Sequence, residues 1–111
     1  MNPVIKIGML GLGTIGTGVV KVLVKNGKDI ETKVGRKLEL SKVLVRDLRK
    51  ERQVDIPHIL TTNPADILDD PEIDIVVEVM GTIDTAFEYI LRAFENKKAV
   101  VTANKDLIAV H

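Results

Sequence analysis

The segment from Val4 to Gly16 constrains the fold most strongly, because an apolar run leads directly into a turn with closely spaced glycines. Gly11, Gly13 and Gly16 follow the spacing G-x-G-x-x-G, which can connect a buried strand to a helix. The first glycine permits a tight turn, the second leaves room for a pyrophosphate, and the third lets the helix pack closely on the sheet. Free N–H groups at the start of such a helix attract anions. The segment therefore predicts a cradle for a dinucleotide.

The residues after the glycines help to distinguish a ligand site from a purely structural turn. Their amphipathic pattern predicts a helix from Thr14 to about Asn26, where Asn26-Gly27 is a typical helix end. A further helical turn or two would end at Gly35. Because a strand pattern precedes the glycines and a helix pattern follows them, the context favours the dinucleotide. The expected apolar stripe of this helix consists of Ile15, Val19, Val22 and Leu23.

The rest of the chain alternates strand and helix patterns, which predicts an α/β fold of the doubly wound Rossmann type. Right-handed crossovers then give a mainly parallel sheet, for which we expect the strand order 3-2-1-4-5. Further strands are predicted at residues 38–45, 59–61, 73–80 and 99–102, and further helices near residues 64–70, 83–94 and 106–110. The helix at residues 83–94 has a stripe expected in the core: Ile83, Phe87, Ile90, Leu91 and Phe94.

Ligands of a doubly wound sheet bind outside the carboxyl ends of its strands. Four loops of this chain are expected to meet there, so they form one candidate site. They contain Gly11 to Gly16, Arg46, Gly81-Thr82 and Asn104-Lys105.

Arg46 bears on the choice between NAD and NADP. Sites specific for NAD usually place an acid after the second strand, whereas a guanidinium there can bind the additional phosphate of NADP. Arg46 follows the predicted second strand, which favours NADP and leaves NAD possible. Asp47 is evidence against this preference if its side chain turns inward, and Arg46 could also be an ordinary solvated arginine.

Glu78 is unusual because it interrupts an otherwise apolar strand pattern. A buried carboxylate must be paired or hydrogen-bonded. We therefore expect a satisfied structural acid first, and a residue of the site second.

Composition excludes several classes of protein. The 111 residues carry 16 acidic and 16 basic side chains with a net charge of zero, and only 3% are aromatic, so binding of nucleic acid is not expected. Without cysteine there is no disulfide or thiolate nucleophile, and no metal site is expected. The sequence has neither an apolar run of about 20 residues for a membrane span nor a signal segment. A soluble, cytoplasmic protein is the expectation.

Four segments together resemble a known family. The sequences Ile-Gly-Met-Leu-Gly-Leu-Gly-Thr-Ile-Gly-Thr-Gly (7–18), Val-Leu-Val-Arg-Asp (43–47), Asp-Ile-Val-Val-Glu-Val-Met-Gly (74–81) and Val-Val-Thr-Ala-Asn-Lys (100–105) are similar to the amino-terminal nucleotide-binding domain of homoserine dehydrogenase. The resemblance covers essentially the whole chain and assigns residues 1–111 to one NAD(P)-binding domain. One departure is Thr82, where the family commonly has a second glycine.

The resemblance implies an enzyme that transfers a hydride reversibly between NAD(P)H and aspartate semialdehyde. The product is homoserine, on the route to threonine, isoleucine and methionine. It also implies that Gly11, Gly13, Thr14 and Ile15 line the pyrophosphate and nicotinamide, and that Lys105 lies near the nicotinamide. The family's main substrate-binding residues and its dimer interface belong to a carboxyl-terminal region that this sequence lacks. The small-molecule substrate is therefore expected to bind only to the full-length homodimer, and the isolated domain is expected to be inactive.

Two other functions remain open. A non-catalytic module that senses a dinucleotide would suit the short chain, although Lys105 would then have no evident purpose at the nicotinamide end. An aspartate semialdehyde dehydrogenase would need a cysteine nucleophile, and this sequence contains none.

Overall fold

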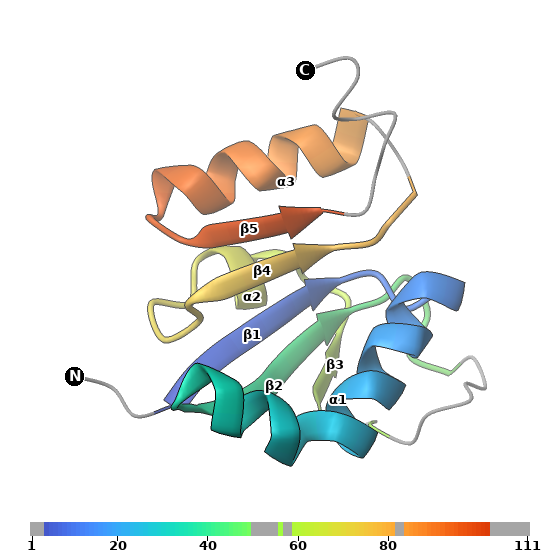
Figure 1. Ribbon diagram of the computed structural model, residues 1–111. Helices are drawn as coiled ribbons and strands as arrows, with labels where there is room; N and C mark the ends of the chain where they lie inside the picture. Colours follow the sequence, from blue (N-terminus) through green and yellow to red (C-terminus); the bar gives the residue numbers. More distant parts are fainter. Residues whose placement is uncertain (1–3, 50–55, 57–58, 82–83, 103–111) are drawn as a thin grey trace.

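The sheet is organised around β1 (Val4–Leu10), whose apolar residues form its central strand. The computed structural model describes residues 4–49, 56, 59–81 and 84–102. Within them, five parallel strands form one sheet in the order β3-β2-β1-β4-β5 (Figure 1). This confirms the predicted Rossmann-type fold and strand order. The other strands are β2 (Lys37–Leu44), β3 (Leu60–Thr61), β4 (Ile75–Glu78) and β5 (Ala99–Thr102).

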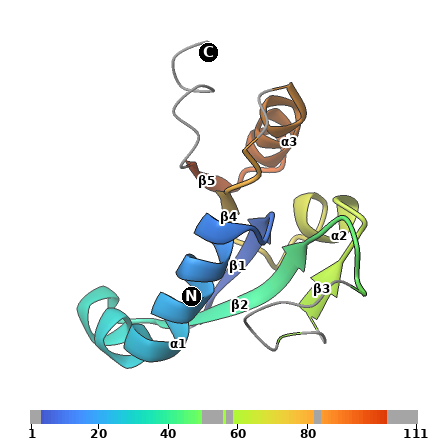
Figure 2. The ribbon, with the colours of Figure 1, turned by 90° about the vertical axis from the view of Figure 1, so that its right-hand side faces the viewer.

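Three helices cover the two faces of this sheet in the described residues: α1 (Thr14–Val34), α2 (Ala65–Leu68) and α3 (Asp84–Glu95). Met9 and Leu10 are neighbours on β1, so their side chains point to opposite faces. Met9 packs in one cluster with Val20 of α1, whereas Leu10 packs with Leu68 of α2 and Ala93 of α3. Figure 2 shows the same arrangement, with α1 on one side of the sheet and α2 and α3 on the other. The fold thus has two hydrophobic cores, one on each face of the sheet.

Helix α1 is longer than the sequence predicts, since it continues through Asn26-Gly27 to Val34. A glycine inside a helix costs only about 1 kcal/mol relative to alanine, which is too little to end a helix by itself. The end comes at Gly35, whose positive φ of 79° and N–H bond to the Glu31 carbonyl (2.8 Å) form a left-handed cap. The expected stop at Asn26-Gly27 was wrong, and the further turns ending at Gly35 are confirmed.

The buried faces of α1 and α3 agree only in part with the predicted stripes, since Ile90 is buried and Val19 and Phe87 pack against core clusters as predicted. On α1 the buried residues are Gly16 and Val20, while Ile15 is 56% exposed. On α3 the buried residues are all small except one: Ala86, Ile90 and Ala93. Leu91 and Phe94, predicted in the core, are exposed, as is Val22 of α1, and Ile83 lies outside the described residues. On α3 the small residues Ala86 and Ala93 occupy the buried face, where larger side chains would hold the helix farther from the sheet.

Polar side chains join the end of α2 to the end of α3. Arg92 makes two hydrogen bonds to the Asp69 carboxylate, through Nε (2.9 Å) and Nη2. These bonds hold the pKa of Asp69 below its usual range. Asn96 donates through Nδ2 to the Leu68 carbonyl (2.6 Å) and to Asp69 (3.1 Å). The two helices are therefore fixed to each other on one face of the sheet.

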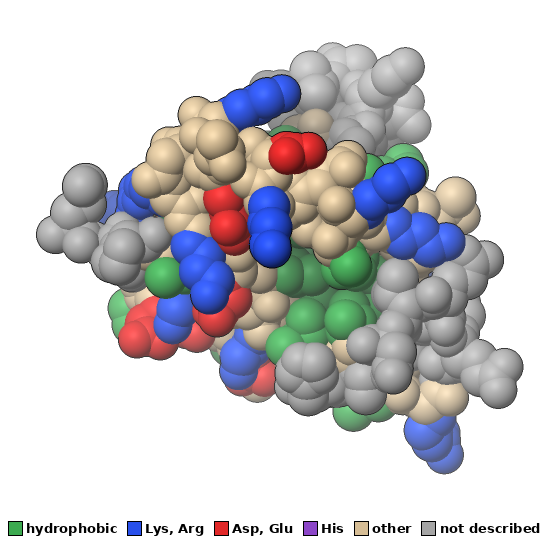
Figure 3. Space-filling model, turned by 60° about the horizontal axis from the view of Figure 1, so that its bottom comes forward, with side chains coloured by type: hydrophobic (Ala, Val, Ile, Leu, Met, Phe, Trp, Pro, Cys, Tyr) green, Lys and Arg blue, Asp and Glu red, His purple; other side chains and the backbone are tan. Residues whose placement is uncertain are grey.

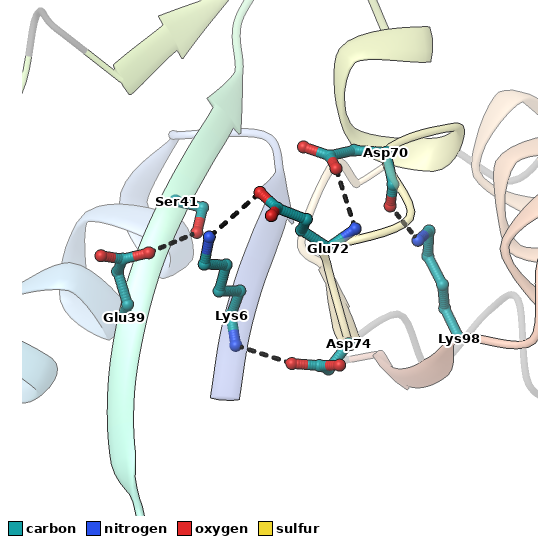
Figure 4. A network of polar contacts seen from close by, with 7 residues as sticks. All are labelled: Lys6, Glu39, Ser41, Asp70, Glu72, Asp74 and Lys98. Atoms are coloured by element: carbon teal, nitrogen blue, oxygen red, sulfur yellow. Dashed lines mark hydrogen bonds and ion pairs between the residues drawn. The ribbon is translucent and has the colours of Figure 1, made fainter. Parts of the chain in front are cut away.

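A second polar network lies near the amino ends of the strands, away from the predicted ligand site (Figure 4). The Lys6 backbone N–H donates to Asp74 (2.9 Å), and Lys6 Nζ donates to Glu72 (3.1 Å). The hydrogen bond with Glu72 raises the pKa of Lys6. Lys98 is 5% exposed, and its ammonium donates to the carbonyls of Ile73 (2.8 Å) and Asp70. These contacts hold the loop before β4 against β1 and β5.

Two features are absent from the described residues, a helix that could span a membrane and a cluster that could bind a metal. None of the helices in the described ranges is long and apolar enough to cross a membrane, and no group of three metal-ligating side chains occurs among the same residues. On the face shown in Figure 3, Lys and Arg side chains lie close to acidic ones, with hydrophobic side chains exposed between them. This face therefore carries charges of both signs.

Candidate functional site

A cleft of about 640 Å³ opens at the carboxyl ends of the central strands. Its wall includes the glycine turn after β1, the residues that follow β2, and the residues that follow β4. The sequence predicted a site at this edge of the sheet. The lining residues most relevant to that prediction are Gly11, Gly13, Arg46, Asp47, Val79 and Met80.

The three glycines of the turn have different physical roles. Gly11 has a φ of 102°, and a Cβ there would lie 3.1 Å from the Val79 carbonyl oxygen. A Cβ on Gly16 would lie 2.8 Å from the Gly11 carbonyl oxygen, so this residue allows α1 to begin close to the sheet. Gly13 differs, because a Cβ there would meet no atom within 4 Å. The fold therefore requires glycine at positions 11 and 16, whereas position 13 faces open space.

The start of α1 lies directly at this turn and has no side-chain cap. Gly13 is the N-cap residue, no acidic side chain occurs in the first turn, and the first α-helical bond runs from the Thr17 N–H to the Gly13 carbonyl (2.8 Å). The amides of Thr14, Ile15 and Gly16 thus precede the first such bond. An uncapped helix start attracts negatively charged groups, since its amides and its dipole both favour them. This arrangement can hold a phosphate.

Arg46 and Asp47 both line the cleft after β2, and both are exposed. The Asp47 carboxylate accepts a hydrogen bond from the Arg49 backbone N–H (2.9 Å), and Arg49 Nε lies 3.8 Å from it. Arg46 makes no hydrogen bond or ion pair with any residue that the structure describes. The Asp47 carboxylate is thus held by its own loop, while the Arg46 guanidinium can reach a ligand.

Glu78 is fully buried at the end of β4. Its carboxylate accepts a hydrogen bond from the Met80 backbone N–H (2.6 Å) and another from the Thr102 hydroxyl (2.7 Å). This confirms the expectation of a satisfied structural acid. Because Met80 lines the cleft and Thr102 ends β5, the carboxylate holds the loop after β4 against the end of β5.

The remaining predicted site residues lie either near the cleft without lining it or outside the described residues. Gly81 is exposed, has a φ of 79°, and is not among the residues that line the cleft. Thr14, Ile15 and Gly16 lie at the start of α1, beside the cleft wall and not within it. Thr82, Asn104 and Lys105 lie outside the described residues, as does the predicted helix at residues 106–110.

Sequence reasoning missed one wall of the cleft. Thr62 and Pro64 reach it from the loop between β3 and α2, and Thr85 and Tyr89 reach it from α3. Thr85 and Tyr89 are four residues apart, so they share one face of the helix. That spacing was a usable signal, but the stripe of larger apolar residues on the same helix obscured it.

The parallel sheet, the glycine turn after β1 and the uncapped helix start beside a cleft define a nucleotide-binding domain of the Rossmann type. The family model described as "Homoserine dehydrogenase, NAD binding domain" matches residues 11–111. The chain therefore belongs to the homoserine dehydrogenase family and matches its NAD-binding domain, as the sequence motifs indicated.

Individual relatives agree with this assignment. The homoserine dehydrogenase of Bacillus subtilis is 47% identical over 108 residues, which cover 96% of this chain and 25% of that protein. The homoserine dehydrogenase of Pseudomonas aeruginosa is 43% identical over 111 residues, which cover 100% of this chain and 25% of that protein. Among solved structures, homoserine dehydrogenase from Thiobacillus denitrificans superimposes with a TM-score of 0.90 and 46% identity over 96% of this chain and 25% of that one. The structure of the S. aureus homoserine dehydrogenase superimposes with a TM-score of 0.89 and 43% identity, and the match covers 97% of this chain and 28% of that one. The chain thus spans about a quarter of these relatives.

Proposed function

We propose that residues 1–111 form the NAD(P)-binding domain of a homoserine dehydrogenase, with the dinucleotide lying across the glycine turn. The observation that carries this proposal is the uncapped start of α1 beside the cleft, where Gly13 leaves open space for a phosphate. The dinucleotide supplies the hydride, and the chain's own residues bind and orient it. In the whole protein the reaction is the reversible reduction of L-aspartate 4-semialdehyde to L-homoserine, for the synthesis of threonine, isoleucine and methionine.

The proposed roles of the site residues follow from their positions. Gly11, Gly13 and Gly16 shape the turn, and the first amides of α1 hold the pyrophosphate. Ile15 offers the nicotinamide an apolar surface, for which its 56% exposure leaves room. Gly81, Thr82, Asn104 and Lys105 complete the nicotinamide side by family resemblance, with Lys105 the residue nearest to the reacting ring.

The proposed preference for NADP over NAD is supported by the region after β2. Arg46 lines the cleft without a partner among the described residues, whereas the Asp47 carboxylate is engaged by Arg49. An always-charged guanidinium suits the additional phosphate of NADP, which an inward carboxylate would repel. NAD remains a possible second cofactor.

The rest of the proposal concerns the whole enzyme. Substrate binding and homodimer formation are assigned to the parts of the relatives that this chain does not span, and a cytoplasmic location is proposed from the sequence. The isolated domain should accordingly bind cofactor but not oxidise homoserine, because catalysis depends on positioning both reactants.

Gly13→Val tests the proposed cradle directly. Since a Cβ at position 13 meets nothing within 4 Å, the variant should fold normally, while its branched side chain occupies the space of the phosphate. Titration calorimetry with NADPH should detect binding to the wild type and none to the variant. Gly18→Val is the matched control, because position 18 is equally open but lies on α1 away from the cleft. Equal NADPH binding by Gly13→Val and the wild type would disprove the cradle.

A further inference from the structure

Strands β4 and β5 lie side by side and end at the same edge of the sheet (Figure 1). The last residue pair of their ladder is Glu78 and Thr102, so both side chains point to the same face of the sheet. Val76, two residues earlier on β4, packs with Ala93 of α3, which identifies this face as the one that α3 covers. The buried Glu78 carboxylate accepts hydrogen bonds from the Thr102 hydroxyl (2.7 Å) and the Met80 N–H (2.6 Å). One side chain thus joins the ends of two strands.

The choice of an acid at this position needs a physical reason. Burying a carboxylate costs free energy that its hydrogen bonds must first offset, and a strand end built from apolar side chains would avoid this cost. Neither Glu78 nor Thr102 lines the cleft, so a ligand there does not contact this pair. The two hydrogen bonds instead fix the geometry of the strand ends.

The segment after β4 forms part of the cleft wall. Val79 and Met80 follow Glu78 directly, and both line the cleft. The Val79 N–H donates to the Leu10 carbonyl (3.0 Å), and a Cβ on Gly11 would lie 3.1 Å from the Val79 carbonyl oxygen and 3.2 Å from the Met80 Cα. This segment is therefore held against the glycine turn on one side and, through Glu78, against β5 on the other.

The segment after β5 also depends on this contact. Thr102 is the last residue of β5, and Lys105 follows it by three residues in the sequence. Three residues span at most about 11 Å, so the position of Thr102 limits where Lys105 can lie. The proposed function assigns Gly81 and Lys105 to the nicotinamide, whereas the adenosine is assigned to the region after β2, on the other side of β1. Glu78 thus connects two segments that serve the nicotinamide half.

We propose that Glu78 and Thr102 are positioning residues, which hold the loop after β4 and the end of β5 in one geometry for the nicotinamide half of the dinucleotide. This inference rests on the proposed dinucleotide binding and adds a role for two residues that do not touch the ligand. A wall that is already held in its binding geometry loses less conformational freedom when the ligand binds. Breaking the contact between the two side chains should therefore weaken binding of the nicotinamide half alone.

The first test is Thr102→Val, which keeps the shape of the side chain and removes the hydroxyl that donates to Glu78. Titration calorimetry should give a dissociation constant for NADPH about threefold to tenfold larger than that of the wild type. The dissociation constant for adenosine 2′,5′-bisphosphate should stay within about twofold, which also shows that the variant is folded. Thr102→Ser restores the hydroxyl, so its affinity for NADPH should lie within about twofold of the wild type.

Thr61→Val is the matched control. Thr61 also ends a strand, and its hydroxyl also donates to a carboxylate, that of Asp66 (2.6 Å), but β3 lies at the opposite edge of the sheet. Thr61 does not line the cleft. The contribution of the nicotinamide half is the ratio of the dissociation constants for adenosine 2′,5′-bisphosphate and NADPH. This ratio should be unchanged in Thr61→Val and reduced in Thr102→Val.

The fluorescence of the reduced nicotinamide ring gives a signature that a merely structural role would not move. Binding to the wild type should increase this emission, and at saturating NADPH the increase should be smaller for Thr102→Val and Glu78→Leu. Glu78→Gln should behave as the wild type, because its amide oxygen can accept from the Met80 N–H and its amide group can donate to the Thr102 hydroxyl. If Glu78→Leu fails to fold by circular dichroism, the Thr102 variants decide.

The outcomes separate this inference from the proposed function. If Thr102→Val and Glu78→Leu bind NADPH as the wild type does, the positioning role is wrong and the dinucleotide site stands. An equal loss for NADPH and adenosine 2′,5′-bisphosphate would also overturn it, because the effect would not be confined to the nicotinamide half. If the wild type binds NADPH no more tightly than adenosine 2′,5′-bisphosphate, the inference fails while cofactor binding stands. If the wild type binds neither, the proposed function fails as well.

Discussion

Replacing Arg46 by alanine should separate the affinities for NADP and NAD. Arg46 is exposed on the cleft and makes no hydrogen bond or ion pair with the described residues, so its loss should leave thermal unfolding nearly unchanged. Any effect on binding then reports the contact with the ligand and not a disturbed fold. The additional phosphate of NADP is the only group that distinguishes the two cofactors.

The expected magnitude follows from the exposure of the guanidinium. A hydrogen bond to a charged group contributes about 1.5–3 kcal/mol, whereas a fully solvated surface ion pair contributes about 0–1 kcal/mol. Because Arg46 is exposed but lines a cleft, we expect the lower end of the first range, about 1.5 kcal/mol. That corresponds to a dissociation constant for NADP that is about tenfold larger in the variant. The dissociation constant for NAD should stay within about twofold.

Titration calorimetry at fixed ionic strength measures both constants, and raising the salt should reduce the difference between wild type and variant. Lys25→Ala is the control, because it also removes one positive charge but lies exposed on α1 and does not line the cleft. It should leave NADP affinity nearly unchanged. An equal loss of affinity for NADP and NAD would mean that Arg46 supports the adenosine pocket without contacting the additional phosphate. No loss for either would refute the assignment.

Two further predictions concern stability. Glu78→Leu should lower the free energy of unfolding in urea by about 1–3 kcal/mol, because the Met80 amide and the Thr102 hydroxyl lose their acceptor, and Glu78→Gln should cost less; equal stability of Glu78→Leu and wild type would contradict this. The Arg92 hydrogen bonds lower the pKa of Asp69, so their contribution is complete above the ordinary value of 3.8 and declines as the pH falls through the lowered pKa. The stability difference between wild type and Arg92→Met should therefore shrink in acid, and a difference independent of pH would refute the pairing.

The fold could be predicted because its main signals are local. The glycine turn, the short apolar strands and their alternation with helices each follow from a few consecutive residues, and together they gave the strand order that the structure has. The physical roles of Gly11 and Gly16 were also predictable, since their spacing is typical of a tight turn and a close contact between helix and sheet.

The details that depend on packing could not be predicted in the same way. The apolar stripe of α3 was predicted only in part, because small residues such as Ala86 and Ala93 occupy the contact with the sheet. Hydrophobicity alone ranks Phe94 above them, although closeness of approach decides which face is buried. Tyr89 was missed as a cleft residue for another reason, since the cleft wall to which it belongs also includes Thr62 and Pro64 from the loop after β3.

The central claim, that a dinucleotide binds across the glycine turn and the cleft beside it, is tested most directly by following backbone amide resonances of the domain during titration with NADPH. The account predicts the largest shifts at Gly11, Gly13 and the first amides of α1, with a second group at Arg46 and Tyr89. Binding of NADPH with shifts confined to the far end of α1, near Gly35, would contradict it.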